Sequence, residues 1–434
     1  MKPGRSRFAV RTLAVFVLFT AFAGQFWRNL LGWWGFGAVA AIAVIAAVAA
    51  LILLKPEWRW RRMPKSLLLF LVFAALSILW SFYPGATAVG IAIQWATTAA
   101  ALFLALCLDW MELLRTLGTA LRWILALSLV FEFAVAIFVR GPLLPFWTDY
   151  GDERVPKAFY WSRGLLFDGG PIEGIVANRN LLCFIALLAV VVFAVQLAER
   201  AVKRGRGVVW LALAVAVFVL ARSATVILAA AGVAVVLGFA LWTRMAGPDR
   251  RRPVYLTSGF VLIAGVAGTI TLWKPLLTAF GKNEDLTGRL DIWAAVAGLA
   301  AGRPVAGWGW VSYWAPWVEP FDDLAARNGV VYLQAHNAWL DVWLQLGVIG
   351  VVLFASLVLA TLWRSWFLAV DRPRFGLDAD RPYTASSLLP LLVMAALLVQ
   401  SVAESRILIE GGWVLLVVLA VTTKRRHGLV EAMP

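Results

Sequence analysis

The sequence predicts an all-α, polytopic membrane protein with about twelve transmembrane helices. Hydrophobic residues make up 62% of its 434 residues and charged residues only 15%, and the mean hydropathy is +0.84. A water-soluble core could not hide so much apolar surface, and uncharged runs of about twenty residues recur along the chain. Because backbone groups in lipid must hydrogen-bond internally, runs of this length indicate helices rather than barrel strands.

Twelve hydrophobic windows follow one another, separated by short polar connections and by two long loops. They cover residues 10–31, 33–54, 66–82, 86–108, 120–139, 174–198, 207–221, 224–243, 254–273, 338–363, 384–403 and 407–423. The first window resembles a signal peptide, but Trp27, Trp33 and Trp34 at interface depth and the window that follows at once favour an uncleaved helix. Cys107 and Cys183 fall within windows, so they predict neither a disulfide framework nor a metal site.

The distribution of basic residues predicts the orientation. If the N-terminus is cytoplasmic, the inner segments hold 25 of the 39 lysines and arginines, and the outer segments hold 11, nearly all in two long loops. The positive-inside rule counts short loops such as KPEWRWRRMPK and AGPDRRRP, so both termini are predicted to be cytoplasmic. The net charge of +15 does not indicate nucleic-acid binding, because no compact basic domain carries it.

Two outer loops, about 140–173 and 274–337, are too long for simple connections and are expected to be functional. The large loop divides the chain into residues 1–273 with nine helices, the loop 274–337 itself, and residues 338–434 with three helices and a tail. Within this loop, Thr287 is expected to cap an amphipathic helix that lies at the outer membrane surface and ends at a glycine-rich stretch. The apolar positions with helical spacing are Leu290, Trp293, Ala294 and Ala297, and the glycine-rich stretch is 302–309.

His336, one of two histidines, is placed at the outer surface. Asn337 is predicted to cap the tenth helix, with Asp341 in its first turns, so His336 immediately precedes the helix. The positive helix end and nearby arginines disfavour an imidazolium, so the ring is expected to stay neutral and able to accept a proton. The alternative is an interfacial histidine with no chemical task, which is the commoner case for an isolated histidine.

Four arginines are candidates for binding an anion. Arg289 lies in the first turn of the loop helix, where a phosphate would meet backbone N–H groups and a guanidinium together; equally, its side chain could extend toward lipid headgroups. Arg222 sits at a short turn between two apolar helices, where an unpaired arginine is costly, so a functional pairing is favoured. Arg179 is a weaker candidate because the asparagines beside it could simply cap the sixth helix, and Arg163 could be only solvated.

Other chemistries have little support in the sequence. It contains no G-x-S-x-G elbow, no Walker loop, no H-E-x-x-H and no pair of cysteine ligands. Asp322 and Asp323 could bind a divalent metal, but adjacent carboxylates without a further ligand are more often a solvated loop. Soluble nucleotide chemistry is therefore improbable.

Four runs in the second half of the chain carry a family resemblance. In order, GKNEDLTGRLDIW, GRPVAGWGW, AHNAWLDVWLQLGVIG and AESRILIEGG resemble the O-antigen ligase and polymerase superfamily of bacterial envelope proteins. The resemblance covers most of the chain and implies a GT-C-like fold of about twelve helices, with a large periplasmic loop between the ninth and tenth. It implies an inner-membrane glycosyltransferase that acts at the periplasmic side, inverts the anomeric centre and needs no metal or cofactor. The donor would be a polysaccharide on undecaprenyl pyrophosphate, and the acceptor, in the ligase branch, lipid A-core.

The resemblance also implies roles for individual residues. His336 matches the essential histidine of the superfamily, Arg289 the arginine of its TGR motif and Arg222 the basic residue of the preceding helical pair. Arg163 and Asn180 match its R-G…N pattern. These residue types suit the chemistry, because an attacking hydroxyl needs a base such as His336, and a departing pyrophosphate gathers charge that guanidinium groups can stabilise. His336 is the expected general base, and the other residues are the expected donor-binding residues.

Three other hypotheses remain open at this stage. An O-antigen or exopolysaccharide polymerase would share the motifs and use a second lipid-linked repeat as its acceptor. A flippase of the lipid-linked sugar is less favoured, because the ionisable candidates gather at the outer end of the helices and no internal repeat is evident. A structural membrane subunit would leave unexplained why His336, Arg222 and Arg289 share one face.

Overall fold

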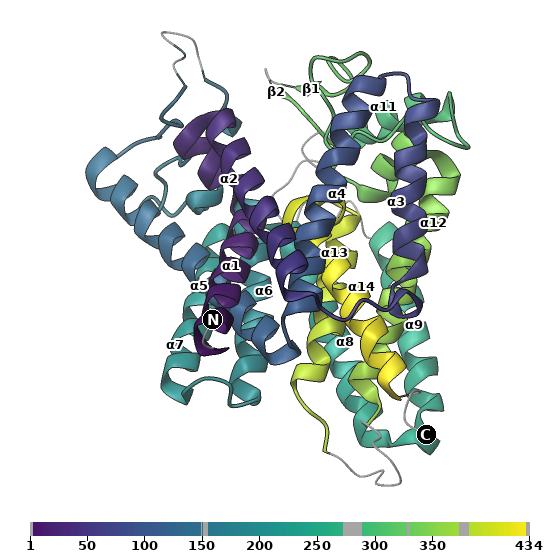
Figure 1. The fold of residues 1–434 in the computed structure, drawn as a ribbon. Helices are drawn as coiled ribbons and strands as arrows, with labels where there is room; N and C mark the ends of the chain where they lie inside the picture. The colour runs from purple at the N-terminus through teal and green to yellow at the C-terminus, as the bar shows by residue number, and fades with distance from the viewer. Residues whose placement is uncertain are drawn as a thin grey trace.

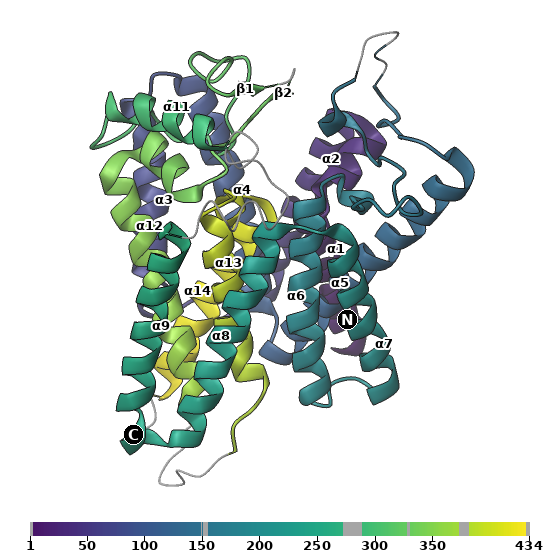
Figure 2. The same ribbon diagram turned by 180° about the vertical axis from the view of Figure 1, so that it is seen from behind.

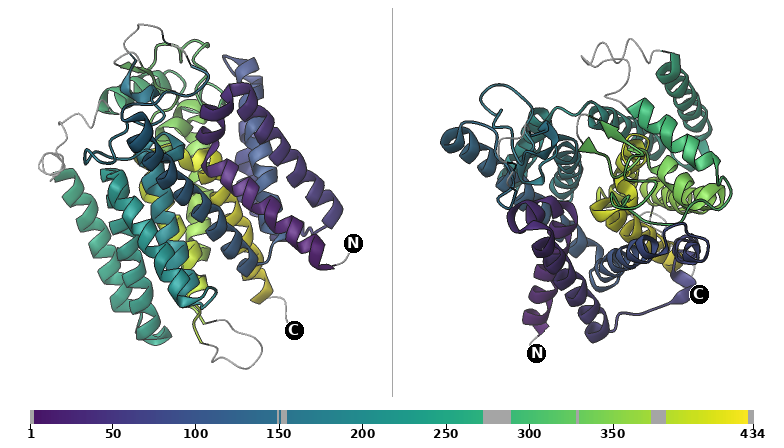
Figure 3. Two further views of the ribbon diagram at one scale, coloured as in Figure 1. Left: turned by 90° about the vertical axis from the view of Figure 1, so that its left-hand side faces the viewer. Right: turned by 90° about the horizontal axis from the view of Figure 1, so that it is seen from above.

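The structure, a computed structural model, describes residues 3–148, 150, 155–271, 289–327, 330–372 and 382–430. Within these residues, the structure has thirteen helices, most of which run roughly side by side in an all-α bundle, while α11 lies across one end of it (Figures 1 to 3). They are α1 (Pro3–Phe22), α2 (Gly24–Leu54), α3 (Lys65–Leu76), α4 (Pro84–Cys107), α5 (Trp110–Ala134), α6 (Arg179–Ala198), α7 (Arg204–Ala221), α8 (Ala224–Ala246), α9 (Arg252–Thr271), α11 (Arg289–Ala301), α12 (Ala338–Val370), α13 (Leu389–Ser401) and α14 (Glu410–Val430).

Shorter elements occupy the connections. A two-stranded antiparallel sheet pairs β1 (Ala326–Arg327) with β2 (Val330–Val331). A π turn at Val135–Val139 extends α5. The 3₁₀ turns of the described chain are Trp60–Arg62, Ser77–Leu79, Lys157–Phe159, Gly174–Val176, Pro248–Arg250, Ser386–Leu388 and Arg406–Leu408.

The chain is a polytopic membrane protein. In the described part of the chain, seven helices are long and apolar enough to cross a membrane. They are Gly24–Leu54, Pro84–Cys107, Trp110–Val139, Arg179–Ala198, Arg204–Ala221, Ala224–Ala246 and Ala338–Val370. Each of the twelve predicted windows overlaps a helix of the structure, so the all-α class is confirmed.

Elements distant in sequence pack against one another in this bundle. α3 packs against α12, α4 against α14, and α8 against α13. α6 lies at the centre, since 78% of its apolar window is buried, compared with 11% for α2 at the periphery. Figures 1 and 2 show α11, the small sheet and the segment that follows α5 at one end of the bundle, with the short α6–α7 and α8–α9 connections at the other. The long loops therefore gather at a single end.

The first two helices break at a different place from the predicted boundary near residue 32. α1 ends at Phe22, α2 begins at Gly24, and residue 32 is a kink inside α2, where Gly32 adopts φ 73°. Glycine reaches this conformation without a Cβ clash, so the helix direction changes while the apolar run continues. The boundary predicted from hydropathy therefore coincides with the kink at Gly32, and the break between α1 and α2 was not predicted.

α5 begins at Trp110 rather than at residue 120. Asp109 caps it, accepting from the Glu112 backbone N–H at 2.7 Å while the Glu112 side chain accepts from the Asp109 backbone N–H at 3.2 Å. The Glu112 carboxylate is nearly buried and pairs with Arg7 at 3.1 Å and Arg11 at 2.7 Å, both from α1. Because a neighbouring helix neutralises its charges, the first part of α5 packs in the bundle despite its low hydropathy.

Other helix ends also differ from the predicted windows. α6 begins at Arg179 rather than 174, because Asn178 caps it by accepting from the Leu181 N–H at 3.0 Å. α12 continues to Val370 instead of ending near 363, while α13 is confined to Leu389–Ser401.

α12 is broken at Gly347, and the loop 304–309 repairs the break. Gly347 has φ 64° and ψ −167°, a conformation that only glycine tolerates well. The helix groups freed at this point bond to the loop backbone: Trp308 N–H to Leu344 O at 3.0 Å, Gly309 N–H to Gln345 O at 2.9 Å, Val348 N–H to Pro304 O at 2.8 Å and Ile349 N–H to Val305 O at 3.2 Å. A broken helix in an apolar setting needs such partners for its backbone groups.

α11 confirms a helix in the large loop and shows which of its faces packs on protein. Thr287, the expected cap, lies outside the described residues. The buried apolar positions are Ile292, Val296 and Ala300, whereas Leu290 is 41% exposed. These three side chains join a second core with Tyr83, Val311, Trp314, Phe321 and Leu344. One face of the helix therefore packs on protein, against α12 and the loop, and the predicted apolar position Leu290 lies on the other side.

Candidate functional site

His336 occupies the predicted position at the start of α12. Asn337 is the N-cap, and its side-chain oxygen accepts from the backbone N–H groups of Trp339 at 3.0 Å and Leu340 at 3.2 Å. His336 itself adopts a left-handed backbone conformation, φ 51°, and the ring of Tyr332 packs edge-on to its imidazole at 5.5 Å. The chain thus turns sharply at His336, and the helix begins after this turn.

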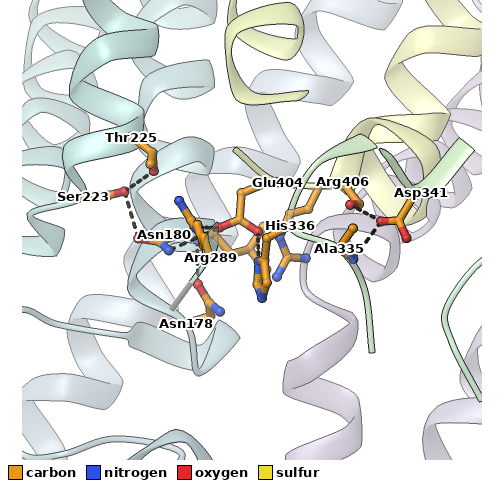
Figure 4. Close-up of polar contacts among 12 residues, drawn as sticks. Asn178, Asn180, Ser223, Thr225, Arg289, Ala335, His336, Asp341, Glu404 and Arg406 are labelled. Carbon is orange, nitrogen blue, oxygen red and sulfur yellow. Dashed lines mark hydrogen bonds and ion pairs between the residues drawn. The ribbon is translucent and has the colours of Figure 1, made fainter. Parts of the chain in front are cut away.

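A carboxylate that the sequence analysis missed, Glu404, binds the imidazole. The Nδ1 atom of His336 lies 2.9 Å from Glu404 Oε2. Arg289 Nη2 donates to the other oxygen, Oε1, at 2.7 Å, and both members of this ion pair are buried. Figure 4 shows Glu404 between the two side chains. Three segments far apart in sequence, α11, the start of α12 and the end of α13, therefore meet at one side chain.

The electrostatics of the cluster assign the imidazole tautomer. Burial alone would raise the pKa of Glu404, but protonated His336, Arg289 and Arg406 outweigh burial and lower the pKa to about 2. An ionised carboxylate can only accept, so Nδ1 of His336 carries the hydrogen. In the neutral ring Nε2 is then left as the acceptor, which is the arrangement a general base requires.

Asn180 joins the cluster from α6. Its Nδ2 atom donates to Glu404 Oε1 at 3.3 Å, and its Oδ1 atom accepts from Ser223 Oγ at 2.8 Å. Ser223 directly precedes α8 and also lies 3.0 Å from Thr225 Oγ1. The asparagine that could have been a simple helix cap is Asn178, whereas Asn180 connects α6 and α8 to the carboxylate.

Arg222 lies beside the cluster but does not contact it directly. It ends α7 in a left-handed conformation, φ 49°, and its guanidinium donates to Gly169 O in the first long loop at 2.7 Å. The side chain is exposed, and its link to Glu404 runs through the neighbouring Ser223 and Asn180. His336 and Arg289 thus meet at Glu404, as expected. Arg222 lies beside the cluster and is linked to it only through its neighbour Ser223 and Asn180.

Arg163 is paired rather than solvated. Its Nε atom donates to Glu173 Oε1 at 2.8 Å, and both side chains are largely buried. Burial raises the pKa of Glu173 to about 7 against the opposing effect of Arg163. Neighbouring Glu132 accepts from Ser162 Oγ and from the Glu173 and Gly174 backbone N–H groups at 2.7 to 2.9 Å. Arg163 therefore helps to hold the first long loop and, among the described residues, bonds to no member of the His336 cluster.

The two alternatives for Arg289 are now separable. The residue is 7% exposed and its guanidinium is ion-paired with Glu404, so it does not extend toward lipid headgroups.

The sequence did hold a signal for Glu404, since AESRILIEGG places carboxylates between two apolar runs at the same end of the bundle as His336. Within the described residues, no three His, Cys, Asp or Glu side chains are grouped to hold a metal ion.

Together, the fold and the cluster define a multi-pass membrane protein with a buried histidine–carboxylate–arginine site at one end of its helices. Residues 207–355 match the family described as O-Antigen ligase. This segment includes Arg222, Arg289 and His336, whereas Asn180 and Glu404 come from outside it. The resemblance expected from the sequence motifs is confirmed over residues 207–355, which are similar to this family.

A curated relative is similar over part of its length. The "Exopolysaccharide production protein ExoQ" of Rhizobium meliloti (strain 1021) is 30% identical over 153 residues. The similar region covers 32% of this chain and 33% of that relative. The relative thus supports a distant relationship over about a third of each protein.

Proposed function

We propose that this protein is a membrane glycosyltransferase that transfers a polysaccharide from undecaprenyl pyrophosphate to an acceptor hydroxyl. The observation that carries the proposal is the geometry around His336: Nδ1 is held by the Glu404 carboxylate at 2.9 Å, so Nε2 is free to accept a proton. The match of residues 207–355 to O-Antigen ligase supports the same reaction class.

The proposed reaction is a direct displacement at the anomeric carbon. The acceptor oxygen forms a bond to that carbon, and the bond from the carbon to the pyrophosphate oxygen breaks with its electron pair. The proton of the attacking hydroxyl moves to Nε2 of His336, and Glu404 stabilises the resulting imidazolium. Because attack occurs opposite the leaving group, the product has the inverted configuration.

Arginines beside the histidine suit the departing pyrophosphate. Glu404 accepts from one amino group of Arg289, and Gly169 accepts from one amino group of Arg222, so other N–H groups of both guanidinium ions remain for phosphate oxygens. Arg179 begins α6 beside Asn180 and forms no hydrogen bond or ion pair to another described side chain. Asn180 orients Glu404, and Arg163 holds the loop whose Gly169 receives Arg222. None of these steps requires a metal or cofactor.

The preferred version is an O-antigen ligase of the bacterial inner membrane that uses lipid A-core as the acceptor. In it, twelve helices cross the membrane, both termini are cytoplasmic and the His336 cluster is periplasmic. The polyprenyl chain stays in the bilayer while the pyrophosphate reaches the cluster at the end of the helices.

Replacement of His336 by alanine tests the base. We expect His336→Ala to lower transfer by about 10²- to 10⁴-fold, the usual contribution of a general base. The assay would use purified protein in nanodiscs, lipid-linked polysaccharide and lipid A-core, with the glycosylated acceptor measured on gels. Tyr332→Phe, which keeps the ring packed against His336, is the control and should stay within a few-fold of the wild type. Wild-type rates from a correctly inserted His336→Ala variant would refute the role.

A polymerase is the second candidate, because the curated relative is named for exopolysaccharide production. The same base and arginines would then serve an acceptor that is itself a lipid-linked repeat. Purified protein supplied with lipid-linked single repeats would produce a ladder of chain lengths if it is a polymerase. A ligase would leave the single repeats unextended and would glycosylate only lipid A-core.

A further inference from the structure

Asp341, in the first turn of α12, hydrogen-bonds to the residue before His336 and to the residue after Glu404. It is 1% exposed. Its Oδ2 atom accepts from the backbone N–H of Ala335 at 3.0 Å and from the hydroxyl of Ser405. Ala335 directly precedes His336, and Ser405 directly follows Glu404. Figure 4 shows Asp341 on the side of the cluster away from Asn180.

We propose that Asp341 is a positioning residue that fixes His336 and Glu404 relative to each other. This inference rests on the proposed function for the role of His336, but the geometric claim can be tested separately. One oxygen atom connects a turn at the start of α12 to the segment after α13, so a change in either segment is transmitted to the other.

The turn at His336 needs such an anchor. A left-handed conformation at a residue other than glycine is strained and persists only where its surroundings hold it. Asp341 holds the turn on one side through Ala335, and Asn337 holds it on the other by capping α12. The imidazole is therefore fixed to the end of α12 from both sides.

Glu404 is anchored in a corresponding way. Its backbone N–H donates to Gln400 O at 2.8 Å, which continues the hydrogen bonding of α13. Beyond Glu404, the Ser405 hydroxyl bonds to Asp341. The distance between His336 Nδ1 and Glu404 Oε2 thus depends on two anchored backbones that share one carboxylate.

Stability alone does not account for this buried carboxylate. Its second oxygen, Oδ1, is buried and makes no well-formed hydrogen bond among the described residues, although the Trp314 side chain interacts with the carboxylate. A buried acceptor without a well-formed hydrogen bond is destabilising, and more so when it is charged. A carboxylate that carries this cost while holding the neighbours of His336 and Glu404 fits a positioning role.

The imidazole itself provides the readout. The chain has two histidines, so His427→Gln leaves His336 as the single reporter for ¹⁵N and ¹³C NMR of histidine-labelled protein in nanodiscs. When His427→Gln is the only substitution, we expect His336 to be in the Nδ1–H tautomer. Asp341→Ala should convert it to a mixture of tautomers, and Asp341→Asn, which keeps an acceptor oxygen, should give a smaller change in the same direction.

Glu132→Gln is the matched control. Glu132 is also a buried carboxylate that accepts several hydrogen bonds, but these bonds hold the first long loop. Its replacement should leave the His336 signals unchanged. Unchanged signals in folded Asp341→Ala would overturn the proposal. If that variant does not fold, unchanged signals in folded Asp341→Asn would overturn it.

Kinetics separate a positioning role from a general loss of stability. We expect Asp341→Asn to lower kcat by at least about 10-fold with little change in KM for the lipid-linked donor, because misplacing a catalytic group slows the chemical step. An increase in KM at unchanged kcat would contradict positioning. If His336→Ala retains full transfer, the proposed function fails, whereas the NMR comparison still decides whether Asp341 orients His336.

Discussion

Arg289 and His336 bind opposite oxygens of the Glu404 carboxylate, and this sharing determines the charge of the cluster. With a neutral imidazole, the guanidinium and the carboxylate cancel. When His336 takes a proton from the acceptor, the cluster gains one positive charge while the pyrophosphate gains negative charge. The site would therefore become more favourable to the leaving group as the reaction proceeds.

Glu404→Gln should destabilise the protein and also slow the proposed transfer reaction. The change leaves the Arg289 guanidinium buried without its anion, which typically costs about 3–5 kcal/mol. Thermal unfolding in detergent would show a lower midpoint for this variant. Glu57→Gln is the control, because the Glu57–Arg59 pair is exposed and such pairs contribute about 0–1 kcal/mol. Equal midpoints for the two variants would contradict a buried ion pair.

Acid should remove the same contribution. Because the pKa of Glu404 is lowered in the folded protein from its ordinary value of 4.5 to about 2, its stabilising effect is present above pH 4.5 and is lost as the pH falls toward 2. The difference in unfolding midpoint between the wild type and Glu404→Gln should shrink on going from pH 6 to pH 3. A difference that stays constant over this range would be evidence against the lowered pKa.

At the scale of elements, the broken helix α12 connects the large loop to the site. The loop 304–309 bonds to the break at Gly347, and Trp308 Nε1 also donates to Leu299 O near the end of α11 at 2.9 Å. α11 begins with Arg289 and α12 begins just after His336. The kink thus sets the distance between the arginine and the histidine, although it lies three helical turns from the latter.

Gly347→Ala should disrupt this junction. An added Cβ would lie 2.2 Å from the Val305 carbonyl, and the backbone conformation itself is costly for alanine by about 1–3 kcal/mol. The unfolding midpoint should fall and transfer should decrease with it. Gly298→Ala is the matched control in α11, where a Cβ meets nothing within 4 Å, and it should be neutral or stabilising by up to about 1 kcal/mol. A Gly347→Ala variant as stable as Gly298→Ala would rule out the close packing.

Sequence periodicity predicted the helices better than it predicted their contacts. The glycine-rich stretch after α11 was correctly expected to end a helix. Nothing local indicates that Gly307 lies against the backbone of Gln345 and that Gly347 lies against the backbone of Val305. The apolar positions of α11 did not indicate which of its sides packs on protein, because α12 and the loop core determine that side. Glu404 was missed as a partner of His336 because 68 residues separate them.

At the scale of the whole molecule, hydropathy alone identifies a polytopic membrane protein. The packing of its helices determines which residues form the His336 cluster. Each of the twelve windows overlaps a helix, because an apolar run is a local property of the sequence. The cluster instead combines α6, α11 and the segments before α12 and after α13, which lie together at one end of the bundle (Figures 1 and 4).

Labelling of single cysteines tests the orientation. Cys107→Ala and Cys183→Ala remove both natural cysteines. In that background, Asp168→Cys and Asp322→Cys, both at exposed positions in the long loops, should react with an impermeant maleimide in intact spheroplasts. Gly205→Cys and Asp249→Cys, exposed at the opposite end of the bundle, should react only after the membrane is opened, since the basic connections are predicted to be cytoplasmic. The reverse pattern would put the His336 cluster in the cytoplasm, where a periplasmic acceptor could not reach Nε2.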